Sequence, residues 1–244
     1  MDLSLLLLAH NESETIKDEI FAWRGELEKL PSLVKWEIVV SEDGSVDGTT
    51  ELLLDLTSKG FIRSVHNPKR LGYSQAFLTG LHATQGQFIF FSDTGGKNDV
   101  NDFWALFFRR NLADLIVGHK VLRTDQFYRR FLTHALNFFL RRYFSNNLLH
   151  DSDSGFRIFN KQVKDLIFEK GTNFRGFIGS EISLRVIFAN LRFMEVPIRY
   201  YGRTGISRGL PLKAIPKSVA QLLLDARNLR YEIRNLSQLD KIEP

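Results

Sequence analysis

The segment LSLLLLAHNESE, residues 3–14, joins an aliphatic run to a polar turn. A strand covered on both faces of a sheet is apolar along its whole length, so this run predicts a buried strand. The run is too short to span a bilayer, and it follows Asp2 rather than a basic segment. We therefore expect neither a membrane anchor nor a secretory leader at this point of the chain.

Four comparable runs follow, over residues 37–41, 61–65, 88–92 and 114–118. The intervals between them are long enough for crossover helices, and strands that alternate with helices predict a parallel α/β sheet. In such sheets, ligands bind at the carboxyl ends of the strands. The polar residues that directly follow each strand are therefore the candidate site.

The second half of the chain has a different pattern. It predicts a long aromatic helix at about 125–147, a helix at about 178–189 and a strand at about 192–200. The C-terminal tail has apolar residues at helical spacing with Lys and Arg between them, which predicts an amphipathic helix. These apolar residues are Ile215, Val219, Leu222, Leu223, Ala226, Leu229 and Ile233. We expect a globular unit over residues 1–210 and a basic helical tail over residues 211–244.

The composition excludes several classes of protein. With 244 residues, of which 43% are hydrophobic and 25% charged, the chain suits one large globular domain or two small ones and is neither disordered nor repetitive. The absence of cysteine excludes disulfides, thiolate metal sites and a cysteine nucleophile. The six histidines never occur at metal-ligand spacing, so we expect structural or surface roles for them. The glycine motifs of P-loop enzymes, common serine hydrolases and dinucleotide-binding folds are absent.

The formal net charge is +5, and two segments carry the excess of positive charge. Residues 119–142 contain six Lys or Arg and one Asp, and residues 201–235 contain seven Lys or Arg and two acidic residues. Both segments are also rich in apolar and aromatic residues, which suits an anionic membrane surface or a phosphate-bearing lipid better than nucleic acid. We expect peripheral attachment to a membrane and no nucleic-acid partner. The alternative, a tail that only packs on the domain, stays open.

Two polar motifs follow the first two predicted strands. The first strand ends in Ala9-His10-Asn11-Glu12, and the second ends in Glu42-Asp43-Gly44-Ser45-Val46-Asp47-Gly48-Thr49. A strand-end carboxylate such as Asp43 can accept hydrogen bonds from a nucleobase N–H or a ribose hydroxyl. Helix capping by Ser13 and an ordinary Asp-Gly turn are simpler explanations of each motif taken alone.

Taken together, in their order and spacing, these motifs resemble the inverting family-two glycosyltransferases of GT-A fold. The likeness continues through Asn67-Pro-Lys-Arg-Leu-Gly72 and Ser74-Gln75-Ala76 to Asp93, which takes the place of the first aspartate of an Asp-x-Asp signature. Asp151 with Ser154-Gly155-Phe156-Arg157, and Glu195-Val196-Pro197-Ile198, are similar to the dolichyl-phosphate mannose synthase subgroup. The resemblance implies an α/β fold of GT-A type, Rossmann-like, with a mostly parallel central sheet flanked by helices and with C-terminal amphipathic helices.

The same resemblance implies a function. It implies transfer of a sugar from a nucleotide-diphosphate-sugar donor to a polyprenyl phosphate of dolichyl type, with inversion, by a peripheral enzyme at the cytoplasmic, inner face of a membrane. The reacting end of the donor would contact Asp93, Lys97 and Arg203. The nucleotide sugar would be held by Ala9, Asn11, Glu12, Glu42, Asp43, Gly44, Gln75, Asp93 and Thr94.

A basic helix pattern indicates where the acceptor phosphate binds. Arg129, Thr133 and Asn137 are four residues apart and so share one helical face. A guanidinium and a hydroxyl on one face can bind a phosphate, and Arg suits bidentate phosphate recognition better than Lys. The dolichyl-phosphate mannose synthase subgroup carries an arginine after its fifth strand and then an Arg-x-x-x-Ser-x-x-x-Asn helix, which Arg123 and Arg129-x-x-x-Thr133-x-x-x-Asn137 resemble. The resemblance therefore implies that Arg123, Arg129, Thr133 and Arg203 bind the acceptor phosphate. A solvated basic face is the alternative.

The chain departs from the family at the metal site. Where the family has Asp-x-Asp-x-Gln, this chain has Asp93-Thr94-Gly95-Gly96-Lys97. The second carboxylate is missing, which leaves the binding of Mg²⁺ or Mn²⁺ at Asp93 in doubt. Lys97 could supply positive charge to the diphosphate instead, or Asp99 could act as a replacement ligand. An inactive, degenerate site is the remaining alternative.

Two other functions stay open. A sugar hydroxyl in a polysaccharide or glycolipid could be the acceptor, in which case Glu181 is the candidate general base, since it lies where the wider family carries a Glu-Asp signature. A catalytically weak protein that only binds sugar nucleotides is the second alternative, suggested by Gly95.

Overall fold

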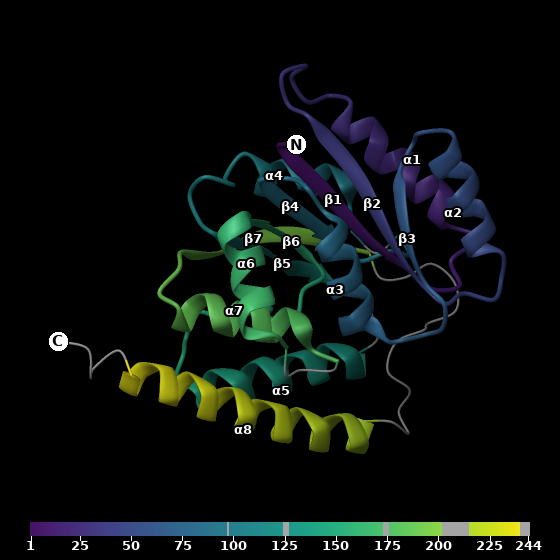
Figure 1. The fold of residues 1–244 in the computed structure, drawn as a ribbon. Helices are drawn as coiled ribbons and strands as arrows, with labels where there is room; N and C mark the ends of the chain where they lie inside the picture. The colour runs from purple at the N-terminus through teal and green to yellow at the C-terminus, as the bar shows by residue number, and fades with distance from the viewer. Residues whose placement is uncertain (97, 124–126, 173–175, 202–214, 240–244) are drawn as a thin grey trace.

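The computed structural model describes residues 1–96, 98–123, 127–172, 176–201 and 215–239. In that part of the chain, seven strands form one sheet in the order β3-β2-β1-β4-β6-β5-β7 (Figure 1). The strands are β1 (Leu3–Ala9), β2 (Trp36–Asp43), β3 (Arg63–Asn67), β4 (Phe88–Ser92), β5 (Leu115–Arg123), β6 (Phe156–Asn160) and β7 (Phe193–Tyr200).

The sheet is mostly parallel, as expected from the sequence. β1 pairs in parallel with β2 and β4, β2 with β3, and β5 with β7. The exception is β6, which lies between β4 and β5 and runs antiparallel to both. The sequence pattern does not predict β6, because a charged residue, the buried Arg157, interrupts its apolar side chains.

Helices cover both faces of the sheet. They are α1 (Ile16–Leu27), α2 (Thr49–Ser58), α3 (Tyr73–Ala83), the 3₁₀ helix η1 (Val100–Asp102), α4 (Phe103–Phe107), α6 (Lys161–Lys170) and α7 (Ile178–Phe188). Successive residues of a strand point to opposite faces. On β1, Leu3, Leu5 and Leu7 therefore pack with α1, α2 and α4, while Leu6 and Leu8 pack with α3, α6 and α7.

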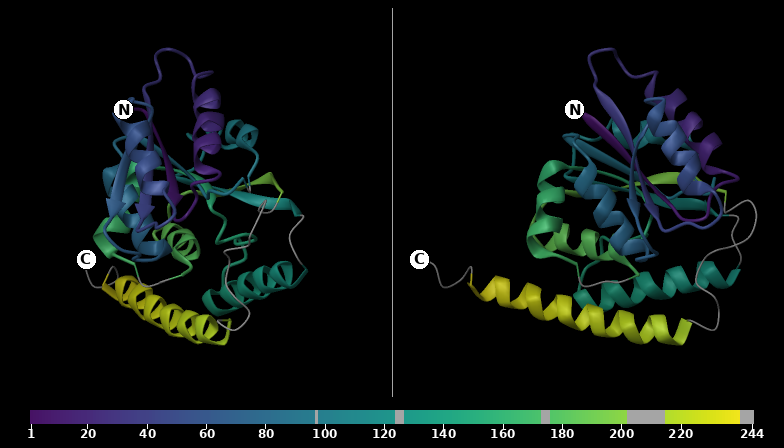
Figure 2. Two further views of the ribbon diagram at one scale, coloured as in Figure 1. Left: turned by 90° about the vertical axis from the view of Figure 1, so that its right-hand side faces the viewer. Right: turned by 45° about the vertical axis from the view of Figure 1, so that its right-hand side comes forward.

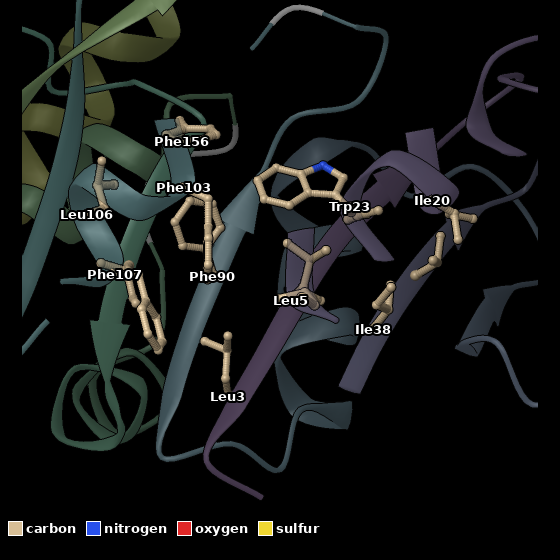
Figure 3. Packing of buried hydrophobic residues seen from close by; sticks show 14 of the residues in the cluster. Leu3, Leu5, Ile20, Trp23, Ile38, Phe90, Phe103, Leu106, Phe107 and Phe156 are labelled. Carbon is tan, nitrogen blue, oxygen red and sulfur yellow. The ribbon is translucent and has the colours of Figure 1, made fainter. Parts of the chain in front are cut away.

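An aromatic cluster fixes β6 in the sheet (Figure 3). Trp23 of α1 lies 5.4 Å from Phe90 of β4 and 6.0 Å from Phe156 of β6, measured between ring centroids, and Phe103 of α4 lies 5.1 Å from Phe90. All four residues are buried. Such pairs contribute about 0.5–1.5 kcal/mol each beyond the burial of their area. Side-chain packing therefore supports the backbone pairing of β6 with β4.

Two long helices, α5 (Phe127–Phe144) and α8 (Ile215–Leu239), form an outer layer beyond α7 (Figures 1 and 2). They share a third apolar cluster, in which Leu140 and Phe144 of α5 lie with Leu222, Ala226 and Leu229 of α8. In the part of the chain that the structure describes, no helix is both long and apolar enough to cross a bilayer.

The predicted apolar stripe of the tail is divided between two sides of α8. Leu222, Ala226 and Leu229 are buried against the domain. Val219 and Leu223, from the same predicted stripe, are 46% and 49% exposed. The stripe therefore packs on the domain only in part, and an exposed apolar surface remains.

A buried ionic network joins α7 to α8. The guanidinium of Arg185 donates to Glu181 at 2.9 Å and to both carboxylate oxygens of Glu232 at 2.8 and 3.0 Å. Arg185 and Glu181 are buried. Burial disfavours the charged guanidinium, but the two carboxylates outweigh this effect and raise the pKa of Arg185. Ionic as well as apolar contacts therefore hold α8 on the domain.

We expect Arg185→Met to lower the free energy of unfolding by roughly 3–5 kcal/mol, because Glu181 would keep a buried charge without the guanidinium. Urea unfolding followed by circular dichroism measures the change. Lys59→Met is the control, because it removes an exposed ion pair with Asp55 and should cost less than about 1 kcal/mol. Equal losses in the two variants would show that the network contributes nothing specific.

Candidate functional site

Four parallel strands, β3, β2, β1 and β4, end side by side. The register pairs Ala9 with Glu42, and Asp43 with Asn67, at the last residues of these strands. The polar segments after β1, β2 and β4 therefore meet, as expected for the carboxyl ends of parallel strands. We call this region the carboxyl edge, defined as residues 9–13, 42–49, 67–73 and 93–96.

The segments after β1 and β2 interlock through hydrogen bonds. The Asn11 N–H donates to Ser45 Oγ at 2.9 Å, and Asn11 Oδ1 accepts from the Val46 N–H at 2.8 Å. The Glu12 N–H donates to Thr49 Oγ1 at 2.9 Å. Asn11 has a φ of +54°, a conformation that Asn adopts more readily than most residues. These contacts set the backbone of both predicted motifs.

Ser13 belongs to the same interlocking contacts and does not cap α1, whose N-cap residue is Thr15. Its N–H and hydroxyl donate to one carboxylate oxygen of Asp47, and the N–H and hydroxyl of Thr49 donate to the other. Burial disfavours ionisation of Asp47, but these hydrogen bonds outweigh it and lower its pKa to about 2. The capping explanation of Ser13 is therefore wrong.

Asp43 is buried and organises the loop that leads into α3. Its carboxylate accepts hydrogen bonds from Asn67 Nδ2 at 3.1 Å and from the backbone N–H groups of Leu71 and Gly72 at 2.8 and 2.9 Å. A Cβ on Gly44 would lie 2.4 Å from a backbone nitrogen of the same loop, so this close approach requires glycine. Asp43, which is predicted to bind the nucleoside, therefore also fixes the shape of the carboxyl edge.

Two side chains that are predicted to bind the nucleotide, those of Glu42 and Thr94, point into the protein. Glu42 is 1% exposed, and its carboxylate accepts from the Ser45 N–H at 2.5 Å. The Thr94 hydroxyl donates to the carbonyl of Leu8 at 2.7 Å. Both side chains brace the carboxyl edge from within, whereas Gln75 is exposed in the first turn of α3.

Asp93 directly follows β4 and is held from two sides. Its N–H donates to the carbonyl of Gly155 at 2.7 Å, and its carboxylate accepts from the Tyr73 hydroxyl at 2.8 Å. A Cβ on Gly155 would lie 2.2 Å from Asp93 Cγ, so the crossing of the two segments requires glycine. Desolvation and the neighbouring charge of Asp93 raise the pKa of Tyr73. The phenol therefore stays protonated and donates a hydrogen bond to the carboxylate.

The place of the missing second carboxylate has an unusual backbone. Gly95 and Gly96 have φ values of +91° and +63°, and their N–H groups donate to Glu19 of α1 at 2.8 and 3.4 Å. Among the described residues, no group of three or more His, Asp or Glu could hold a metal ion. Since Mg²⁺ can combine a single carboxylate with phosphate oxygens, Asp93 fits a divalent ion only together with a bound diphosphate.

A buried arginine holds the segment that leads into β6. Arg157 is 1% exposed, and its guanidinium donates to the backbone carbonyls of Ser152, Ser154 and Gly179. Asp153 lies in this segment. Burial raises the pKa of Asp153 to about 7, while Arg157 and Lys120 oppose the rise and Asp93 adds to it.

A basic pocket of about 300 Å³ lies between the end of β5, helix α5 and the turn at residues 150–151. Asp151 lines this pocket, and Gly155, four residues later, contacts Asp93. At most ~14 Å of extended chain therefore separates the pocket lining from the contact with Asp93. Thr133 and Asn137 line the pocket together, as their spacing predicts. Its described lining residues are His119, Lys120, Val121, Arg130, Thr133, His134, Asn137, Arg141, His150 and Asp151.

Other predicted site residues cannot be placed in this geometry. Lys97 and Arg203 lie outside the described residues, and so do the side chains of Arg123 in β5 and Arg129 in α5.

Two acids suggested by the sequence are engaged elsewhere. Glu181, the candidate general base for a sugar-hydroxyl acceptor, is fully buried and paired with Arg185. Asp99 caps η1 by accepting from the Asn101 N–H at 2.9 Å, and it pairs with Arg199 at 3.0 Å. Asp99 lines a separate hollow beside α1, and Asp93 is not among the described residues of that hollow.

Several residues of the site are missed by sequence reasoning. Tyr73 follows a glycine loop and Asp153 lies in a polar turn, and neither position has a pattern of its own. The Ser154-Gly155-Phe156-Arg157 motif is the one signal that pointed to this segment, without indicating that Arg157 is buried. The histidines of the pocket come from three separate segments, so their spacing carries no signal.

The raised pKa of Asp153 predicts a pH dependence of stability. Since the folded state holds this proton more tightly than the unfolded chain, stability is lost as the pH rises from about 3.8 to about 7. We expect Asp153→Asn, in the presence of a chelator, to gain in melting temperature relative to wild type between pH 4 and pH 8. Asp55→Asn, at an exposed site, is the control and should show a constant offset. A constant offset for Asp153→Asn as well would contradict the assignment.

Solved structures share this fold. Glucosyl-3-phosphoglycerate synthase from Mycobacterium tuberculosis, solved in complex with Mn²⁺, uridine-diphosphate-glucose and phosphoglyceric acid, aligns with a TM-score of 0.64 over 92% of this chain and 79% of that one, at 19% identity. TarS from Staphylococcus aureus aligns with a TM-score of 0.57 over 83% and 60% of the two chains, at 15% identity. The GT-A type of α/β fold is confirmed.

Two curated relatives match most of this chain but are themselves longer. Glycosyltransferase AglD from Haloferax volcanii is 25% identical over 204 residues, which cover 81% of this chain and 33% of that protein. Dolichyl-phosphate beta-glucosyltransferase ALG5A from Trichomonas vaginalis is 23% identical over 213 residues, which cover 81% and 65%. This chain thus spans less than two thirds of either relative.

The family model named Glycosyl transferase family 2 matches residues 4–167. This range contains the carboxyl edge, Asp93, the basic pocket and the segment from His150 to Gly155. The chain therefore belongs to glycosyl transferase family 2.

Proposed function

We propose that this chain transfers a sugar from a nucleotide-diphosphate-sugar donor to a polyprenyl phosphate of dolichyl type, with inversion at the anomeric carbon. Membership of the family and the names of the curated relatives support this activity. The observation that carries the choice of acceptor is the basic pocket beside Asp93, with exposed aromatic rings at its rim.

The rim of the pocket suits a lipid. Phe131 and Phe138 of α5 are 65% and 66% exposed and lie seven residues apart, with the pocket residue His134 between them on the same helix surface. A phosphate bound in the pocket would leave its isoprenoid chain against these rings. Cations for the phosphate and aromatic surface for the chain favour a lipid phosphate over a sugar hydroxyl.

The donor would lie along the carboxyl edge. The nucleoside would contact Asn11, Glu12 and Asp43, and the diphosphate would reach Asp93. The backbone of Ala9 and Gly44 borders this path, Gln75 is exposed beside it, and Glu42 and Thr94 support it from within.

The chemistry requires one substitution at the anomeric carbon. An ionised oxygen of the acceptor phosphate attacks this carbon while its bond to the donor diphosphate breaks, and the nucleotide diphosphate leaves with the electron pair. A phosphate is already ionised near neutral pH, so a strong general base is not needed. The burial of Glu181 and its pairing with Arg185 favour this acceptor over a hydroxyl, which would need Glu181 as its base.

Positive charge has to reduce the repulsion between two anionic substrates. Lys120, Arg130 and Arg141 line the pocket, and we propose that Arg123, Arg129, Thr133 and Arg203 add to them as predicted from the sequence. Lys97 would face the diphosphate. Mg²⁺ or Mn²⁺, held between Asp93 and the diphosphate, would supply further charge for the leaving group.

The proposal predicts a lipid product that depends on Asp93. Incubation with radiolabelled UDP-glucose or GDP-mannose and a short polyprenyl phosphate should transfer label into the organic phase. Asp93→Asn should lower the initial rate by at least about 100-fold, because the diphosphate loses its strand-end carboxylate. The control Asp55→Asn should retain the wild-type rate. Label found only in a water-soluble glycan would exclude the lipid acceptor, and no transfer to any acceptor would favour a protein that only binds sugar nucleotides.

We also propose that the layer of α5 and α8 contacts the anionic inner, cytoplasmic face of a membrane, with residues 1–210 as the catalytic unit and residues 211–244 as the attached tail. Val219, Leu223 and Leu224 of α8 are about half exposed, and Lys217 before them and Arg227 after them flank this stretch of the helix. Exposed apolar side chains flanked by Lys and Arg favour the interface of an anionic bilayer.

Flotation with anionic liposomes measures this attachment. We expect the protein to float at low salt and less at high salt, because the cations are screened. The double variant Leu223→Ser/Leu224→Ser should float less at both salt concentrations. Leu54→Ser removes a leucine of equal exposure (51%) from α2, outside this layer, and should behave as wild type. A protein that ignores the liposomes under all conditions would contradict the proposal.

A further inference from the structure

Three of the six histidines gather around the basic pocket, although the sequence gives no reason to group them. His119 comes from β5, His134 from α5 and His150 from the turn before β6. The rings of His119 and His150 are stacked, with centroids 5.8 Å apart and planes at 26°. Since no described group of three or more His, Asp or Glu could hold a metal ion, these rings call for another role.

The surroundings fix the tautomer of two of these rings. His134 Nδ1 lies 2.6 Å from the carbonyl oxygen of Arg130, and His150 Nδ1 lies 2.7 Å from a carboxylate oxygen of Glu195. These oxygens can only accept, so Nδ1 carries the hydrogen in both rings. In the neutral ring, Nε2 is then an acceptor. Among the described residues, no group is hydrogen-bonded to either Nε2.

This tautomer has a consequence for an anion in the pocket. Phosphate oxygens are acceptors, so a neutral ring would place one acceptor against another. When the ring takes up a proton, Nε2–H becomes a donor and the hydrogen bond to phosphate is assisted by charge. Glu195 supports the charged form of His150, because its other oxygen also accepts from the His150 backbone N–H at 2.8 Å.

We propose that the basic pocket binds a phosphate monoester together with protons that are taken up by His134 and His150. The identification of that monoester as the lipid acceptor rests on the proposed function, whereas proton-linked binding of the phosphate group does not. Imidazole is the side chain that commonly exchanges a proton near neutral pH, so binding would depend on pH in the physiological range.

The other charged groups around the rings set the range in which this dependence can be measured. A phosphate monoester itself gains a proton near pH 6, which weakens its attraction to the pocket at lower pH. The useful range is therefore about pH 7 to 8.5. The charged and titratable groups around the rings are His119, stacked on His150, and Lys120 of β5, Arg130 and Arg141 of α5, Asp151 of the turn and Glu195 of β7. Asp153 and Tyr200 lie near Lys120.

Isothermal titration with glycerol 3-phosphate, a phosphate monoester, tests the proposal on the full chain. Titrations at pH 7.5 in two buffers of different ionisation enthalpy give the number of protons taken up, and we expect roughly one to two per phosphate bound. The affinity should fall roughly 30-fold from pH 7 to pH 8.5 for each proton taken up, because log K decreases by one per pH unit for every linked proton. The double variant His134→Gln/His150→Gln should lose the proton uptake. His82→Gln, on α3 beside Phe168 and outside the pocket, is the matched control and should titrate as wild type.

Proton uptake that persists in the double variant, with its fold verified by circular dichroism, would overturn the proposal, and so would the absence of phosphate binding. Glycerol 3-phosphate and farnesyl phosphate in detergent distinguish a soluble ester from a lipid headgroup, and we expect farnesyl phosphate to bind more tightly because of Phe131 and Phe138. Sugar transfer to lipid without proton-linked binding would refute this inference alone. Proton-linked binding without any lipid product would refute the proposed function alone.

Discussion

The antiparallel pairing of β6 with β4 is the constraint on which the site depends. Because β6 runs against its neighbours, its first residue, Phe156, pairs with Ser92 at the end of β4. The segment from His150 to Gly155 therefore arrives at the carboxyl ends of the other strands. A parallel β6 of five residues would deliver the same segment at the opposite end of the sheet, ~17 Å away. One reversed strand thus brings Asp93 and the basic pocket together.

Arg157 makes this junction rigid. It lies in β6, and its guanidinium reaches carbonyl groups of the preceding turn and of Gly179 at the start of α7. Burial lowers the pKa of Arg157, and the nearby carboxyl groups of Asp153, Asp93 and Asp151 oppose that effect. The described hydrogen bonds of Arg157 go to uncharged carbonyl groups, so no single carboxylate neutralises its positive charge. That charge reduces the repulsion among the nearby carboxyl groups, which can therefore lie close together at this end of the sheet.

The parallel part of the fold could be predicted from the sequence, because each mainly apolar run overlaps a strand, and the run at residues 88–92 coincides with β4. The meeting of Asn11 with the Ser45–Val46 turn after β2 followed from the rule that parallel strands end together. The direction of β6 could not be predicted, since a five-residue strand has no directional signal. Nor could burial be assigned within the tail, because helical spacing does not decide whether Leu222 or Leu223 faces the domain. The histidine group depended on three elements whose packing is not encoded locally.

The loss of the second aspartate goes together with a change of backbone conformation. Gly95 and Gly96 are consecutive residues with positive φ, and both donate to Glu19, which comes from a different element. An aspartate at position 95 would be strained by its φ of +91° and would bring a second negative charge next to Glu19. Restoring the Asp-x-Asp signature would therefore require a change in α1 as well as in this loop. α1 supplies a carboxylate that accepts from the two backbone N–H groups of this loop. The described part of this loop supplies no second carboxylate beside Asp93, so a cation there would need further oxygen ligands, such as those of a diphosphate.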